Sequence, residues 1–132
     1  MSPPSTALTF TKLCVRDLGR STEFYERALG MRVAARFERA DLLEVQLQFG
    51  DGPGEASLVL MEWIPARDVV VGHEHGRLGI ATGDLDALFA RVRRAGGKVT
   101  EEPRELPEHG VRVGFVADPD GYSIEIVGPL AR

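Results

Sequence analysis

The chain has 132 residues, of which 43% are hydrophobic and 27% charged, and its formal net charge is −4. This length suffices for one domain with a sizeable core. The negative charge argues against nucleic-acid partners, which require a basic patch. The sequence contains no apolar run of about 18 residues, so no membrane-spanning segment and no membrane partner are predicted. The single cysteine, Cys14, excludes an intrachain disulfide and fits a reducing, cytoplasmic setting.

The first half of the chain predicts one helix and four strands. Residues 1–7 are expected to form a loose leader, and the alternating pattern of residues 8–15 predicts a strand. Asp17 is a typical helix N-cap, and apolar residues at helical spacing follow it until Gly30, where the helix should end. Strands are predicted at residues 31–37, 42–49 and 57–63, with a turn at residues 51–54.

The second half repeats this order after a linker at residues 64–76. Residues 77–81 predict a strand, and an apolar stripe predicts a helix that Asp84 caps and that ends at Gly96 and Gly97. The pattern favours a short strand at residues 98–101, which should stop before Pro103 and Pro107. Strands at residues 111–117 and 122–127 follow, joined by a tight turn at residues 118–121 whose carboxylates receive no catalytic role.

A shift of 67 residues relates the two halves, because it places Asp17 on Asp84 and Gly30 on Gly97. An internal repeat of this kind indicates a duplicated supersecondary module. We therefore expect an α+β fold in which two tandem βαβββ modules, residues 8–63 and 77–132, form a curved mixed sheet around a concave cavity. Modules of this size are marginal alone, so they should share an interface or pair with a second chain, as in a homodimer.

Three segments resemble the signatures of a known superfamily. They are residues 15–31 (VRDLGRSTEFYERALGM), residues 95–99 (AGGKV) and residues 115–126 (FVADPDGYSIEI). These segments are similar to those of the vicinal oxygen chelate superfamily, which includes glyoxalase I, extradiol dioxygenases, fosfomycin-resistance enzymes and bleomycin-binding proteins. The resemblance extends over about residues 8–128. It implies the fold strongly and the reaction weakly, because this fold carries many chemistries.

The resemblance also marks four positions in the cavity. In metal-dependent members, His, Gln or Glu at these positions hold a divalent metal that chelates two adjacent substrate oxygens. The superfamily's first-strand and last-strand ligands fall on Phe10 and Glu125, and the repeat carries these two positions onto Arg77 and Val59. Phenyl and isopropyl groups cannot ligate a metal, and a guanidinium cation opposes one. The sequence therefore favours a metal-independent member with no cofactor.

The favoured function is the binding of a small organic ligand in the concave cavity, as in the resistance or sequestration role of bleomycin-binding proteins. A metal-free isomerase or lyase step in the same pocket is a close variant, with Glu125 as the catalytic base and Arg77 as the anion stabiliser. A purely structural ion pair between these two residues is equally open. The predicted ligand-binding residues are Phe10, Lys12, Cys14, Val59, Met61, Trp63 and His75.

A metalloenzyme of the glyoxalase I or dioxygenase kind is the alternative. If the chain is extended near residue 75, His75 shares a face with Arg77, and His75 with Glu125 could then hold a divalent metal in a rearranged site. A solvated linker is the other interpretation of His75, and His109 is expected in a turn. Glu44, Gln46 and Gln48 give one strand a polar face that either lines the cavity or meets water.

Overall fold

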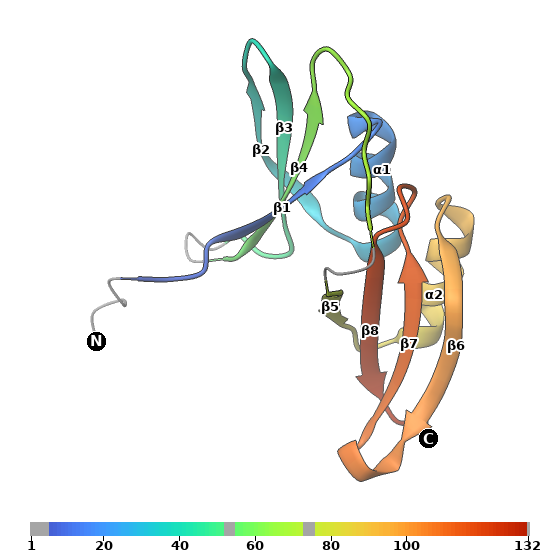
Figure 1. Cartoon of the computed structure of the whole chain (residues 1–132). Coiled ribbons are helices and arrows are strands. Elements are labelled where there is room, and N and C mark those ends of the chain that lie inside the picture. The colour runs from blue at the N-terminus through green and yellow to red at the C-terminus, as the bar shows by residue number, and fades with distance from the viewer. Residues whose placement is uncertain (1–5, 52–54, 73–75, 132) are drawn as a thin grey trace.

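Each half of the chain folds into one helix packed on a four-stranded sheet (Figure 1). The computed structural model describes residues 6–51, 55–72 and 76–131. The first module contains β1 (Phe10–Cys14), α1 (Leu18–Leu29), β2 (Arg32–Glu38), β3 (Leu42–Gln48) and β4 (Ser57–Trp63). The second contains β5 (Leu78–Ala81), α2 (Leu85–Arg94), β6 (Lys98–Leu106), a 3-10 turn (Pro107–His109), β7 (Val111–Ala117) and β8 (Ser123–Pro129).

The two sheets have the same topology. Their strand orders are β1-β4-β3-β2 and β5-β8-β7-β6, so β1 and β5 are both edge strands. In each sheet the first strand runs parallel to the last, and the remaining pairs are antiparallel. The predicted α+β class and the duplicated βαβββ arrangement are confirmed. Among the described residues, no helix is long and apolar enough to cross a membrane.

The repeat also reproduces the local chemistry of the helix starts. Asp17 accepts a hydrogen bond of 3.0 Å from the Arg20 N–H, and Asp84 accepts one of 3.0 Å from the Ala87 N–H. Both N-cap predictions are therefore confirmed. The helix ends differ, because Gly30 caps α1 in the left-handed conformation (φ 78°), whereas α2 stops at Arg94.

The predicted end of the strand before Pro103 is wrong. β6 runs through this proline to Leu106, although a proline cannot donate to a strand ladder. Two features permit it: β6 is the edge of its sheet, and the register with β7 shifts between Glu101 and Arg104. Pro103 therefore lies in an irregular stretch of an edge strand, where prolines are tolerated.

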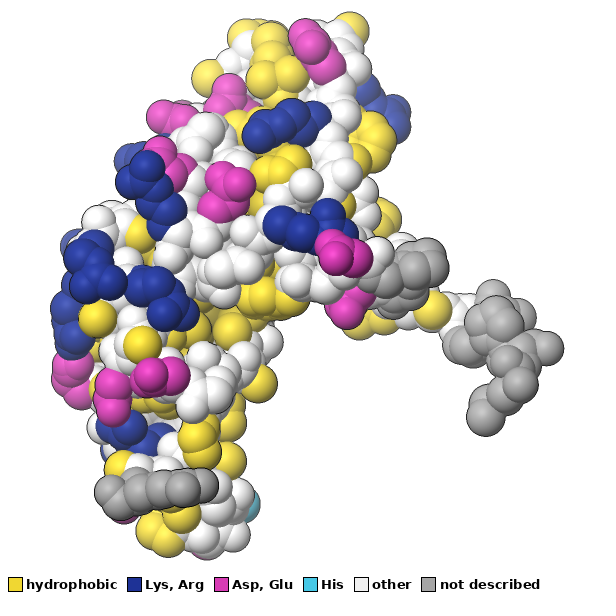
Figure 2. Space-filling model, turned by 180° about the vertical axis from the view of Figure 1, so that it is seen from behind, with side chains coloured by type: hydrophobic (Ala, Val, Ile, Leu, Met, Phe, Trp, Pro, Cys, Tyr) yellow, Lys and Arg dark blue, Asp and Glu magenta, His cyan; other side chains and the backbone are white. Residues whose placement is uncertain are grey.

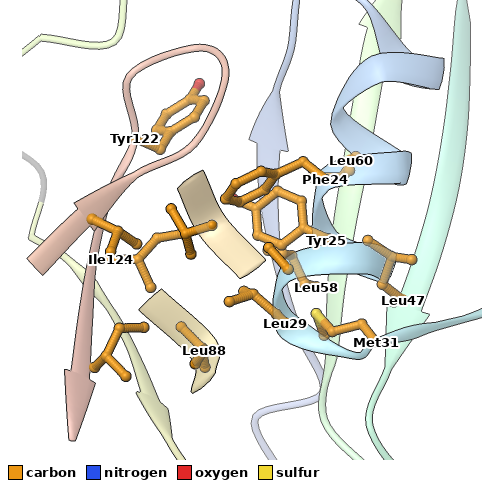
Figure 3. Packing of buried hydrophobic residues seen from close by; sticks show 14 of the residues in the cluster. Phe24, Tyr25, Leu29, Met31, Leu47, Leu58, Leu60, Leu88, Tyr122 and Ile124 are labelled. Carbon is orange, nitrogen blue, oxygen red and sulfur yellow. The ribbon is translucent and has the colours of Figure 1, made fainter. Parts of the chain in front are cut away.

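One hydrophobic core serves both modules. Phe24, Tyr25 and Leu29 of α1 extend toward Leu88 of α2 and Ile124 of β8 (Figure 3), and all five belong to one buried cluster. The helices therefore pack between the modules, and each sheet keeps a second face turned away from its own helix. The space-filling view shows an arched molecule that is hollowed on one side (Figure 2).

The turn between β7 and β8 also contacts the first module. The Asp120 carboxylate accepts hydrogen bonds from Arg16 Nη1 (2.8 Å), the Arg16 backbone N–H (3.1 Å) and the Ser21 hydroxyl (3.0 Å). The side chain of Asp120 is fully buried. The turn predicted at residues 118–121 thus has a second role, which local sequence did not reveal: it holds the two modules together.

Candidate ligand-binding site

The first sheet has one face turned away from α1, which we call the open face of the first sheet. Leu13, Leu58 and Leu60 pack with the core under the helix, and side chains alternate along a strand. The register of β1, β4 and β3 then places the intervening side chains together on the open face. They are Phe10, Lys12 and Cys14 of β1, Val59, Met61 and Trp63 of β4, and Glu44 and Gln46 of β3.

An ion pair crosses this face from one side of β4 to the other. Lys12 of β1 and Glu44 of β3 approach to 2.5 Å between Nζ and Oε2. The aliphatic part of the lysine and the glutamate side chain extend over the middle of β4, where Val59 and Met61 are only 7% and 5% exposed. The Glu44 side chain itself is 9% exposed. The Lys12 ammonium is thus the partner of the buried Glu44 Oε2.

A hollow of about 270 Å³ lies on the open face beside this ion pair. Three of the predicted ligand-binding residues, Phe10, Lys12 and Val59, line it. Met61 and Trp63 share the face without lining the hollow, and the Arg67 guanidinium lies 3.7 Å from the centre of the Trp63 ring. We call this cavity the sheet-1 hollow; its lining consists of Phe10, Lys12, Phe37, Arg39, Glu44, Gln46 and Val59.

A larger cleft of about 450 Å³ separates the edge strands β1 and β5. It brings together the predicted residues Lys12, Cys14 and Arg77. Tyr122 also lines it, and its hydroxyl donates a 2.6 Å hydrogen bond to the Cys14 carbonyl. Burial raises the pKa of the Tyr122 phenol, so this group stays protonated at neutral pH and can act as the donor. The full lining is Thr11, Lys12, Leu13, Cys14, Gly76, Arg77, Leu78, Tyr122 and Ser123.

Glu125 and Arg77 lie on the corresponding open face of the second sheet. Ile124 and Ile126 pack in the core, so Glu125 between them points to the opposite side, next to Gly79 and Phe115 in the register. The Arg77 guanidinium lies 4.6 Å from the centre of the Phe115 ring. Within the described part of the chain, Arg77 and Glu125 form no ion pair with each other, so nothing there supports a purely structural pair. Glu125 lines neither the hollow nor the cleft.

The other residues that the sequence suggested for the site lie in several different places. His75, together with the proposed extended segment around it, lies outside the described residues, as do residues 52–54 of the predicted turn. His109 belongs to the 3-10 turn. Glu44 and Gln46 line the hollow, whereas the Gln48 amide donates to Ser57 and to the Glu55 carbonyl.

Sequence reasoning missed Phe37, Arg39 and Tyr122 as cavity residues. The alternation of the predicted strand at residues 31–37 could have placed Phe37 on the same face as Ala35, but which face meets the cavity depends on pairing with β3. Tyr122 joins the cleft through a contact with a residue 108 positions away, which leaves no local signal.

Comparison with known proteins shows which family this chain is similar to. Residues 7–126 match the model of the Glyoxalase/Bleomycin resistance protein/Dioxygenase superfamily. A probable lactoylglutathione lyase of Vibrio cholerae is 33% identical over 119 residues, which cover 89% of this chain and 86% of that protein. The lactoylglutathione lyase of Haemophilus influenzae is 34% identical over 119 residues, 89% of this chain and 88% of that protein.

Solved structures of the same kind share the fold. The trypanothione-dependent glyoxalase I of Leishmania major superposes with a TM-score of 0.74 at 30% identity, covering 94% of this chain and 87% of that one. Glyoxalase I of Zea mays gives a TM-score of 0.83 at 24% identity and covers 93% of this chain. This chain spans about half of the maize enzyme, since the match covers 47% of it.

Proposed function

Because the chain belongs to the glyoxalase/bleomycin resistance protein/dioxygenase superfamily, we propose that it is a glyoxalase I-like lyase acting on a thiol adduct of a small carbonyl compound. The observation that carries this proposal is the group of relatives named lactoylglutathione lyase, which are 33% and 34% identical over nearly nine-tenths of the chain. They favour an enzyme over the sequestering role that the sequence alone favoured. The open faces of the two sheets are the proposed substrate surface.

The chemistry of such a step is a proton transfer between adjacent carbons. A base removes the proton from the carbon that bears the hydroxyl and sulfur of a hemithioacetal, which leaves an enediolate. The proton returns to the neighbouring carbon, the oxygen on that carbon takes up the proton of the hydroxyl group, and the product is a 2-hydroxy thioester. Glu125 is the proposed base, since a carboxylate on an open sheet face can both accept and return a proton. Arg77 is the proposed group that stabilises the intermediate oxyanion.

The divalent metal that the resemblance implies does not fit the described residues. Of the four superfamily positions, Phe10 and Val59 offer no lone pair, and Arg77 carries a positive charge. Only Glu125 is a donor, whereas zinc and similar ions need several. The described residues also contain no cluster of three or more His, Cys, Asp or Glu side chains that could hold a metal. The proposed reaction therefore uses only side chains of this protein.

A metal-independent ligand-binding protein is the second candidate. The observation that favours it is the apolar lining at two former ligand positions, because Phe10 and Val59 both border the sheet-1 hollow. Apolar walls with a few polar groups are typical of small-molecule sites. In this version the protein holds an organic molecule without converting it.

One set of assays separates these candidates. Protein purified without chelator is analysed for metal and then assayed for thioester formation from the methylglyoxal–glutathione hemithioacetal, with and without added nickel or zinc. We expect turnover without stoichiometric metal, and a loss of turnover in Glu125→Gln but not in Glu108→Gln, a change at an exposed glutamate of the 3-10 turn. Ligand binding without turnover would favour the second candidate. Stoichiometric metal would point instead to donors such as His75.

We further propose that the protein works as a homodimer. Two large side chains on the open face of the first sheet are strongly exposed: Phe10 (49%) and Phe37 (50%). Exposed aromatic groups on the free edge strands β1 and β2 favour association with a second copy. Sedimentation equilibrium should give twice the chain mass, and a monomer at all concentrations would contradict the proposal. The free thiol of Cys14 supports a cytoplasmic location.

A further inference from the structure

We propose that a second site, on the helix side of the molecule, binds a compact anion that bears a phosphate group. The site is a hollow of about 320 Å³, which we call the helix hollow, and its lining consists of Arg27, Arg91, Arg94 and Ala95. It shares no residue with the sheet-1 hollow or with the cleft between β1 and β5. The proposal therefore does not depend on the proposed function of the open faces.

The internal repeat brings these arginines together. Arg27 and Arg94 are related by the same shift of 67 residues that relates the two helix caps. They occupy the last turns of α1 and α2, and the two helices pack against each other. Arg91, one turn before Arg94, adds a third guanidinium group. Lys and Arg side chains gather on the outer side of the arch, away from its hollowed side (Figure 2).

One of the three guanidinium groups is held in place across the boundary between the modules. Arg91 Nε donates a 3.1 Å hydrogen bond to the carbonyl of Ala28, near the end of α1. The two terminal nitrogens of Arg91 donate to no residue in the described ranges, so they remain available as a pair of donors. A planar fork that is already oriented in this way matches the oxygens of a phosphate group.

The charges around the helix hollow favour an anion. Arg27 pairs with Glu23 at 2.8 Å, whereas Arg91 and Arg94 have no carboxylate partner within the part of the chain that the structure describes. Each helix C-terminus adds roughly half a negative charge, so the three guanidinium charges exceed the negative charge nearby by about one unit. Like charges around one hollow repel each other, and an anion between them removes this repulsion.

The lining also restricts the kind of anion. Apart from Ala95, the hollow is lined by arginines, so it offers no aromatic or branched apolar wall to a large organic group. A phosphate group accepts hydrogen bonds at three or more oxygens, whereas a carboxylate has only two, and three guanidinium groups therefore suit phosphate better. Inorganic phosphate and a small phosphomonoester share this chemistry. Either one would connect α1 to α2 and stabilise the packing of the two modules.

The test uses inorganic phosphate and glycerol 3-phosphate as probes for the full chain, at an ionic strength held constant with potassium chloride. We expect both probes to shift the backbone amide signals at the ends of α1 and α2 saturably in NMR spectra. Both should also raise the melting temperature, whereas chloride alone should not. Tighter binding of inorganic phosphate would identify the free ion as the ligand, and tighter binding of glycerol 3-phosphate would identify a phosphomonoester.

Two variants of α2 separate a specific site from general attraction. Arg94→Gln should weaken the binding of inorganic phosphate about tenfold, as expected for the loss of hydrogen bonds between charged groups. Arg93→Gln removes the same charge from the same turn, but Arg93 pairs with Glu102 and does not line the helix hollow. This control should change the affinity by less than about twofold, because salt screens the attraction over longer distances. Equal weakening in the two variants, shifts confined to the open faces, or no saturable shift with either probe would overturn the proposal.

Discussion

The phenol of Tyr25 donates a 2.8 Å hydrogen bond to Oδ2 of Asp118, which joins the helix of the first module to the last turn of the second. Both groups are buried. The other oxygen of Asp118 accepts the backbone N–H groups of Asp120, Gly121 and Tyr122 at 2.9–3.0 Å. A single carboxylate thus shapes the turn and anchors α1, so two of the three segments that resemble superfamily signatures, residues 15–31 and 115–126, form one contact between the modules.

Replacing Tyr25 by phenylalanine should destabilise the fold. The substitution keeps the ring in the shared core but leaves Oδ2 of Asp118 buried without its donor. Loss of a hydrogen bond to a buried charged group costs about 1–3 kcal/mol. Urea denaturation of Tyr25→Phe should therefore show a lower free energy of unfolding by that amount.

The control for this variant is Glu23→Gln, which breaks the solvent-exposed ion pair between Glu23 and Arg27. Exposed pairs contribute little, so this change should leave the denaturation midpoint nearly unchanged. Equal effects of the two substitutions would show that the Tyr25–Asp118 contact carries no special share of stability.

The same contact predicts a loss of stability in alkali. Burial, and then the nearby Asp118 carboxylate, raise the pKa of Tyr25 well above its ordinary value. The unfolded chain releases this proton near pH 10, before the folded chain does. The stabilising contribution is therefore complete below about pH 10 and declines as the pH rises above it. Stability measured from pH 8 to 11 should fall less steeply in Tyr25→Phe; parallel profiles would contradict the prediction.

Local patterns predicted most of the fold, because alternation, caps and turns act over a few residues. Asp17 and Asp84 cap their helices as expected. The strand end predicted before Pro103 was wrong, because the position of a strand at a sheet edge and a shift in its register are not local properties of the sequence. The site was predicted in part. The resemblance and the internal repeat together assigned Phe10 and Val59 to the same cavity. The burial of Glu44 could not be predicted in this way, because it depends on Lys12 from another strand. Contacts such as Tyr25–Asp118, between residues 93 positions apart, have no local signature.

Gly97 should not tolerate even a methyl group. A Cβ at this position would lie 2.5 Å from Phe24 Cε1 and 2.9 Å from the Ala117 carbonyl oxygen, where α1 meets the second module. Overpacking of this kind costs about 1–3 kcal/mol. Gly97→Ala should therefore lower the melting temperature clearly. Gly83→Ala, at a position with open space and no positive φ, should leave it unchanged or slightly raised.

Restoring donors at the four superfamily positions should create a metal site. The triple variant Phe10→His, Val59→Glu, Arg77→His leaves Glu125 in place and supplies two N and O donors on the open face of each sheet. If the proposed dimer brings one such face from each chain together, the four donors form a set that suits zinc or nickel. Val59 is 7% exposed, so the new carboxylate is costly without a cation; the metal-free variant should melt at a lower temperature and recover on metal addition. Calorimetry should give one ion per chain for the variant, and adding Glu125→Gln should weaken binding by more than about tenfold. One tightly held ion in the unmodified protein, unaffected by these substitutions, would contradict the assignment of the four positions.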